Sequence, residues 1–252
     1  MSALAQRLAE LRLAFVFLTR LPVPLDEARQ STLAQAGWAF PVCGAVVGLI
    51  AWLGYAIGSA LGLPALLCAL FAIAAGVLVT GALHEDGLAD FADGMGGGRE
   101  RVRKLEIMRD SATGSYGVLA LILVVASKAN AIAEIGAAGP ALAALVALGA
   151  ASRFAVLLAM AVMTPARAEG LGKDAGAAGG WRIAVGLALT LMAAAPLGLA
   201  GLGAVIGTLA AAAVPAAIAW RQIGGQTGDV LGAIQQIGEL GGWIALIALS
   251  LA

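Results

Sequence analysis

Long apolar runs separated by short polar breaks set the pattern of the whole chain. Each run is close to the ~20 residues that an α-helix needs to cross the hydrocarbon core of a bilayer. Because backbone polar groups must be satisfied within a membrane, such runs indicate helices rather than separate strands. We predict an all-α fold: a polytopic integral membrane protein with about seven transmembrane helices in one membrane-embedded domain over residues 1–252. The predicted spans cover about 33–60, 64–83, 115–136, 141–163, 183–199, 202–220 and the stretch after Asp229.

Residues 1–30 differ from the rest, because arginines are scattered among leucines and phenylalanines there. This mixture predicts a basic amphipathic helix that lies at the membrane surface. Pro22 and Pro24 are expected to end it.

Composition supports the membrane assignment: 61% of the 252 residues are hydrophobic and only 12% are charged. A soluble domain has roughly a quarter of its residues charged. The formal net charge is zero, so we expect no nucleic-acid partner. The lipid bilayer is the expected surroundings, and the many small residues leave room for a homo-oligomer.

The positions of the 15 Lys and Arg residues predict the topology. All but Lys128 and Arg153 fall in the N-terminal segment or in loops on one side of the predicted membrane, and the turns near Gly62, Gly139 and Gly201 carry none. By the positive-inside rule, the N-terminus and every loop long enough to form a site face the cytoplasm.

The acidic stretch HEDGLADFADG at residues 84–94 follows an apolar run directly. On a helix, Asp86, Asp90 and Asp93 fall within an arc of about 60°. Like charges this close either raise one another's pKa or bind a cation. Oxygen ligands without a Cys or His cage favour Mg²⁺, which is the predicted cofactor. The alternative is a solvated acidic end of a span.

A glycine run at residues 95–98 is predicted to break this helix and to free backbone N–H groups for a phosphate, or to be a plain flexible loop. The next segment, read as a helix, places Arg99, Arg103, Glu106 and Asp110 on one side. The arginines would clamp phosphates and the acids would complete a metal shell. Alternatively, this is an interfacial helix in contact with anionic lipid.

Lys128 and Arg153 lie within predicted spans and need partners there. We predict that they face a polar vestibule and hold an anionic substrate; snorkelling to the interface is the alternative. His84, the only histidine, is either structural or a general acid–base group.

The last polar loop ends in GQTGD at residues 225–229. Thr227 is a plausible N-cap for the final helix. Asp229, Gln236 and Glu239 share one flank of that helix, either as a second acidic contribution to the site or as a polar stripe packed against neighbours.

Carboxylates for a divalent metal, with arginines and glycines for phosphates, at the cytoplasmic membrane edge, indicate phosphoryl or nucleotidyl-type transfer. Four stretches resemble the cobalamin synthase family. They are FLTRLPVP at 17–24, HEDGLADFADG at 84–94, LEIMRDS at 105–111 and GQTGD at 225–229. These stretches occur in the same order as in the family, and together they span nearly the whole chain.

The resemblance implies a membrane enzyme of the bacterial inner membrane, with its active site facing the cytoplasm. It would transfer α-ribazole, or its 5′-phosphate, onto adenosylcobinamide-GDP with release of GMP and a requirement for Mg²⁺. The implied metal ligands are Asp86, Asp90 and Asp93, supported by Glu85 and Glu106. Either Asp93 or Asp110 would take the hydroxyl proton, with His84 as a further candidate for acid–base catalysis. The charge and capping patterns predict Arg99, Arg103, Lys128, Arg153, Thr227 and Asp229 as substrate-binding residues.

Two other functions remain as alternatives. Residues 90–94 match the opening of the CDP-alcohol phosphotransferase motif, but Gly97-Gly98 stands where an Ala-Arg pair is expected and the second half of that motif is missing. A cation-coupled transporter would explain Lys128, Arg153 and Glu134 within the spans. It would not explain acids gathered at one edge beside a basic loop, and the broken midplane helices of many transporters are not indicated.

Overall fold

The computed structural model of the protein describes residues 3–24, 31–167 and 179–250. Within these ranges the chain is helical and forms no β-strand beyond one isolated bridge between Pro165 and Gln226. The all-α prediction is confirmed. The long helices are α1 (Ala3–Leu18), α3 (Phe40–Ala60), α4 (Ala65–Thr80), α5 (Leu83–Gly97), α7 (Ser115–Glu134), α8 (Ala138–Val162), α9 (Gly180–Ala194), α10 (Gly198–Ile223) and α11 (Gly228–Ser250). The short ones are α2 (Leu33–Ala36), α6 (Arg101–Ile107) and the 3₁₀ turns η1 (Gly37–Ala39) and η2 (Ala195–Leu197).

The structure corrects the number of membrane spans. In the described part of the chain, five helical stretches are long and apolar enough to cross a membrane, or six if the bent pair α4–α5 is one span. Helix α4 has only 16 residues and meets α5 at an angle of 91°. Helix α9 has only 15 residues and continues through η2 into α10. The prediction of seven spans was wrong because it gave both short helices a full crossing.

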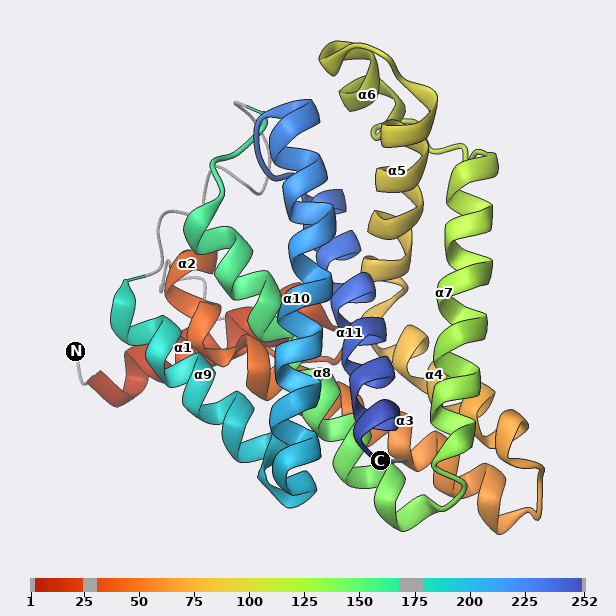
Figure 1. Cartoon of the computed structure of the whole chain (residues 1–252). Coiled ribbons are helices and arrows are strands. Elements are labelled where there is room, and N and C mark those ends of the chain that lie inside the picture. The colour runs from red at the N-terminus through yellow and green to blue at the C-terminus, as the bar shows by residue number, and fades with distance from the viewer. Residues whose placement is uncertain (1–2, 25–30, 168–178, 251–252) are drawn as a thin grey trace.

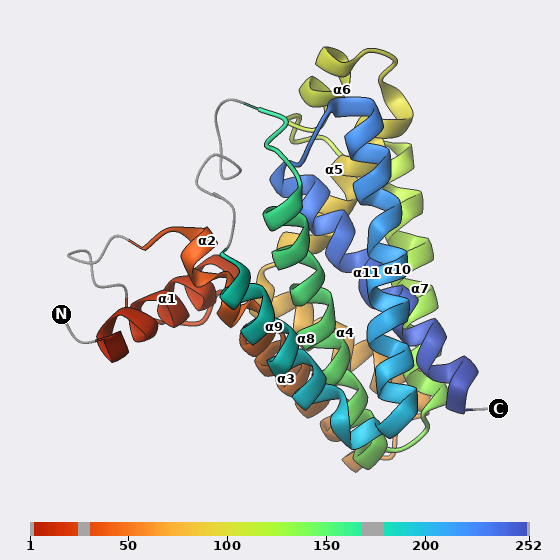
Figure 2. The same cartoon turned by 60° about the vertical axis from the view of Figure 1, so that its left-hand side comes forward.

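Helix α11 lies at the centre of the bundle and contacts α10, α8, α5 and α7 (Figures 1 and 2). Helix α6 and the connection between α10 and α11 lie at the same end, at the top of Figure 1. The side chain of Arg101 joins them, because its guanidinium donates to the backbone oxygens of Ile223 at 2.8 Å and Ala166 at 2.7 Å. Helix α6, which carries Arg103 and Glu106, therefore meets the connection that carries Thr227 at one end of the bundle.

Small residues allow the central helices to touch along their backbones. A Cβ added at Gly44 of α3 would clash with the backbone oxygen of Gly149 of α8. Large apolar side chains point outward instead, and Leu78, Leu199 and Met192 are among the exposed ones. Small residues at helix contacts and large apolar residues outside are what lipid surroundings favour.

The predicted N-terminal helix is present as α1, and it ends before Pro22, as predicted. One side of it is not purely apolar, because the buried Glu10 carboxylate is paired with Arg7 at 2.6 Å and accepts from Nε1 of Trp38 at 2.8 Å. Leu4 and Leu8 are exposed on α1. Its location at the membrane surface stays a prediction. Two of the basic residues counted as cytoplasmic, Arg29 and Lys173, lie outside the described residues.

Candidate active site

Two glycines bring the acidic helix α5 against α11. A Cβ added at Gly87 would lie 3.1 Å from the Cα of Gly232 and 3.2 Å from the Cα of Asp229. A Cβ added at Gly232 would lie 3.1 Å from the backbone oxygen of His84. The two helices therefore cross in backbone contact, which places Asp229 beside the carboxylates of α5.

This crossing gathers the acidic cluster, by which we mean Asp86, Asp90 and Asp229. The charges of Asp86 and Asp229 both act on Asp90, and Asp86 and Asp229 line the same cavity. The side chain of Asp90 makes no hydrogen bond or ion pair with the described residues. The helical grouping of Asp86 and Asp90 was predictable from their spacing, whereas Asp229 joins them through the fold.

Arg167 is the cation of the acidic cluster, and sequence reasoning counted it only as a loop charge. Its guanidinium lies 3.8 Å from the carboxylate of Asp229 and donates to the backbone oxygen of Leu105 at 3.0 Å. Burial lowers the pKa of Arg167, and the neighbouring Asp229 and Asp90 oppose that shift. Its buried Nε has no hydrogen-bond partner in the described structure. An arginine so placed stays charged and has a free donor for an anion.

Thr227 caps α11, as predicted. Its hydroxyl oxygen accepts from the backbone N–H of Val230 at 3.3 Å, and the hydroxyl donates to Asp229 at 3.2 Å. The hydroxyl thus holds the Asp229 carboxylate at the start of the helix. Contact of Thr227 with a substrate stays a prediction.

Asp93 has a different environment from its neighbours on α5. One carboxylate oxygen accepts from the N–H of Gly114 at 2.6 Å and the other from the N–H of Gly117 at 2.9 Å. These amides belong to the first turn of α7, where backbone donors lack helical partners. Asp93 therefore caps α7. Both carboxylate oxygens of Asp93 are thus engaged by backbone amides.

The glycine run does not form the predicted loop. Helix α5 continues to Gly97, so residues 95–97 remain helical. The ammonium group of Lys104 donates to the backbone oxygens of Met95 at 2.9 Å and Gly98 at 2.6 Å. A buried lysine thus satisfies carbonyl groups at the C-terminal end of α5, where the helix dipole favours a positive charge.

The residues on and beside α6 lie farther out than predicted. Arg99 and Asp110 are exposed. Arg103 and Glu106 form an ion pair at 3.1 Å with more than half of each side chain exposed. Glu106 is therefore not gathered with the acidic cluster, because it lies on the outer face of the short helix. The phosphate-binding role of the two arginines and the base role of Asp110 stay predictions.

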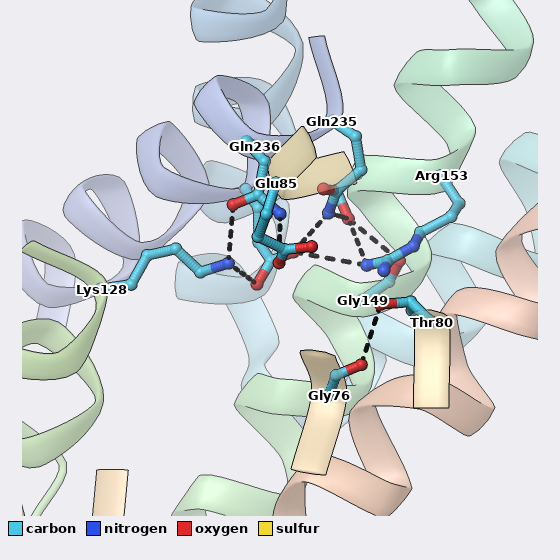
Figure 3. Close-up of polar contacts among 10 residues, drawn as sticks. Gly76, Thr80, Glu85, Lys128, Gly149, Arg153, Gln235 and Gln236 are labelled. Carbon is cyan, nitrogen blue, oxygen red and sulfur yellow. Dashed lines mark hydrogen bonds and ion pairs between the residues drawn. The ribbon is translucent and has the colours of Figure 1, made fainter. Parts of the chain in front are cut away.

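Lys128 and Arg153 have a partner that the sequence did not identify for them. Glu239 of α11 lies 3.0 Å from Nζ of Lys128 and 3.3 Å from an N–H nitrogen of Arg153. Gln235 and Ser152 extend this buried network by hydrogen bonds, as Figure 3 shows for the labelled residues. Both cations are thus buried and paired inside the bundle rather than snorkelling to the interface, and both line one pocket with Glu239. Whether this pocket opens to the cytoplasm as a vestibule stays a prediction. Their binding of a substrate stays a prediction.

Glu85 belongs to the same interior cluster rather than to the acidic face. Its Oε1 accepts from Nε2 of Gln236 at 2.8 Å, and Gln236 in turn accepts from Lys128 at 3.2 Å (Figure 3). A single turn of α5 therefore directs Glu85 into the bundle and Asp86 toward the cavity that Asp229 also lines.

The comparisons with known proteins agree with the sequence motifs. Residues 10–247 match the family model described as cobalamin-5-phosphate synthase. The chain belongs to this family. Relatives described as adenosylcobinamide-GDP ribazoletransferase include proteins of Bradyrhizobium diazoefficiens, Mesorhizobium japonicum and Brucella ovis. They are 48%, 44% and 40% identical to the chain, and the matches cover 92%, 93% and 92% of it and 91%, 91% and 93% of the respective relatives.

No solved structure was found to match the chain. The family assignment and the descriptions of these relatives favour neither the phospholipid-synthesis alternative nor the transporter.

The predicted metal ligands of this cobalamin-5-phosphate synthase family member do not converge on one metal-binding site. Among the described residues, no group of three or more His, Cys, Asp or Glu side chains is arranged to hold a metal ion. Glu85 is engaged in the interior, Asp93 caps α7 and Glu106 is exposed. The acidic cluster alone has the oxygen donors and the negative charge that suit Mg²⁺. Mg²⁺ usually takes one or two carboxylates and completes its shell with water and substrate phosphates, so this donor set fits it.

Proposed function

We propose that the protein transfers α-ribazole, or its 5′-phosphate, onto adenosylcobinamide-GDP and releases GMP. The observation that carries this proposal is the family match over residues 10–247, whose acidic motif lies in the structure beside Asp229 and Arg167. Positioning and charge neutralisation are the main demands of such a transfer.

In this reaction a hydroxyl oxygen of the acceptor forms a bond to the phosphorus attached to cobinamide. The bond from that phosphorus to the bridging oxygen of the diphosphate breaks, and GMP leaves with the electron pair. The hydroxyl proton passes to a carboxylate. Asp90 is the best-placed acceptor, because its side chain has no hydrogen bond or ion pair with the described residues and lies among like charges.

Arg167 supplies positive charge to the bound diphosphate in this proposal. Its unpartnered Nε is available for a charge-assisted hydrogen bond, and its backbone contact with Leu105 fixes the guanidinium next to Asp229. Asp93 acts differently: it holds the start of α7 against α5 and so positions the helix that carries Asp90.

Mg²⁺ is the proposed cofactor, held by one or two carboxylates of the acidic cluster together with substrate phosphate. When bound, it would neutralise charge on the diphosphate and on the leaving GMP. The protein is proposed to lie in the bacterial inner membrane with this end of the bundle facing the cytoplasm, in keeping with the charge distribution of its loops.

The first prediction tests the reaction itself. Purified protein in detergent or lipid, given adenosylcobinamide-GDP and α-ribazole, should release GMP in equal amount to the cobalamin product, as measured by chromatography. Omission of either substrate should abolish the release, and a lipid alcohol in place of α-ribazole should not support it. Absence of GMP release from folded protein with both substrates would refute the proposal.

A further inference from the structure

A largely apolar cavity adjoins the acidic cluster and has no assigned role. It has a volume of about 160 Å³ and lies between α1, α2, α5, α8 and α11. Six side chains give it apolar walls: Phe17, Leu18, Leu33, Leu83, Val156 and Met160. Its polar lining includes His84, Asp86 and Asp229. Most of the cavity wall is thus apolar, and one part of it is acidic.

His84 gives this cavity a buried hydrogen-bonding group. Only 3% of the residue is exposed, and its Nδ1 has no hydrogen-bond partner in the described part of the chain. A neutral imidazole carries one N–H donor and one acceptor nitrogen. His84 lines the cavity, so its imidazole can offer a hydrogen bond to a ligand nitrogen there.

We propose that this cavity is the subsite for the heterocyclic base of the acceptor nucleoside, an inference that rests on the proposed function. The base of α-ribazole is a methylated benzimidazole: flat, mostly apolar, and with one ring nitrogen left free as a hydrogen-bond acceptor. The apolar walls match its ring and methyl groups, and the N–H of His84 matches its free nitrogen.

The position of the acids gives the orientation of the acceptor. Asp86 and Asp229 line the same cavity as His84, and the charges of both act on Asp90. With the base between the apolar walls, the ribose lies on the acidic side, where a hydroxyl group meets the cluster. One cavity thus binds the base and places the nucleophile.

The same lining gives the subsite its selectivity. Adenine and guanine carry several polar groups that the walls formed by Leu18, Val156 and Met160 cannot satisfy, and burying such groups unpaired is unfavourable. The guanosine of the donor is therefore excluded from this cavity, and the two nucleosides bind in separate places.

The test fills the cavity from α8. We expect Met160→Phe to raise both the Kd and the KM for α-ribazole about tenfold or more, and to change the KM for adenosylcobinamide-GDP less than twofold. The matched control is Leu158→Phe, because Leu158 lines a separate apolar hollow with Leu209. Leu83→Trp is the second variant; Leu83 is 40% exposed and tolerates a larger side chain at the cavity edge.

Equilibrium binding of α-ribazole separates this inference from the proposed reaction. Wild-type protein that binds α-ribazole but releases no GMP, with binding lost in Met160→Phe, would refute the reaction and retain the subsite. Normal GMP release together with unchanged Kd and KM for α-ribazole in Met160→Phe and Leu83→Trp would overturn the subsite and leave the reaction standing. An equal loss in Leu158→Phe, or displacement of α-ribazole by adenosine at similar concentration, would also overturn it.

Discussion

At the residue scale, identical side chains have different tasks because their surroundings differ. Asp93 is 6% exposed and held by two backbone amides, whereas Asp90 is three residues away and has no such partner. Glu85 faces the interior, next to Asp86, which faces the cavity. Spacing along a helix indicated which acids share a side, but the partners that set the role of each come from other helices.

The buried cations show the same dependence on partners. The carboxylate of Glu239 pairs with both Lys128 and Arg153, and only 14% of its side chain is exposed. Removing one member of such a group leaves an uncompensated charge in a low-dielectric interior.

The second prediction follows from this arrangement. Glu239→Gln should destabilise the protein by about 3–5 kcal/mol, because Lys128 and Arg153 would lose their counter-charge. Thermal unfolding of the purified protein in detergent measures the change. Glu134→Gln, at the exposed end of α7, is the matched control and should unfold like the wild type. An unchanged unfolding midpoint in Glu239→Gln, with a raised KM for substrate, would instead show that the cations serve substrate binding.

At the element scale, the relation between α5 and α11 creates the site. Gly87 and Gly232 allow backbone contact, and the Thr227 cap starts α11 with Asp229 in its first turn. Asp86 and Asp90 gain a third acid only through this crossing.

The third prediction concerns this crossing. In Gly232→Ala the new Cβ would lie 3.0 Å from the Cα of Gly87, so the two backbones must separate by a few tenths of an ångström. A displacement of about 1 Å in an active site can cost on the order of a hundredfold in rate, and this smaller displacement costs less. We expect kcat to fall at least tenfold while the protein still inserts and purifies normally. Gly76→Ala is the control, because its Cβ would meet only Ala51 at 3.9 Å. Equal activity of both variants would show that the close crossing is dispensable.

Features that depend on neighbouring residues in the sequence were predictable. Features that depend on contacts between distant residues were not. The helical acidic stretch and the cap at Thr227 follow from spacing and residue type. The continuation of α5 through its glycines depends on Lys104, and the start of α7 depends on Asp93. Arg167 had no motif of its own, and only the fold shows its pairing with Asp229.

At the scale of the whole molecule, composition identified a multi-pass membrane protein but miscounted its crossings. Hydropathy reports how apolar a stretch is, whereas the 91° bend between α4 and α5 depends on three-dimensional packing. Helix α6 and the α10–α11 connection lie at one end of the bundle. The side chains of Arg101 and Arg167 join α6 to the segments that follow α8 and α10. The charge distribution predicts that this end faces the cytoplasm.

The fourth prediction tests that orientation. In a variant without Cys43 and Cys68, which are both buried, a single cysteine at Glu100 should react with a membrane-impermeant thiol reagent only when the cytoplasmic side is accessible. A cysteine at Gly139, where an added Cβ meets nothing within 4 Å, should react only from the opposite side. The reverse labelling pattern would overturn the predicted topology.

The central claim is that the acidic cluster of α5 and α11 binds Mg²⁺ together with the diphosphate. The most direct test is a Mg²⁺ titration of GMP release by the wild type, Asp90→Asn and Glu106→Gln. Wild-type release should stop in EDTA and return with Mg²⁺, Asp90→Asn should lose on the order of a hundredfold in kcat, and Glu106→Gln should stay within about twofold of the wild type. Full activity in EDTA, or a wild-type Mg²⁺ response in Asp90→Asn, would contradict the claim.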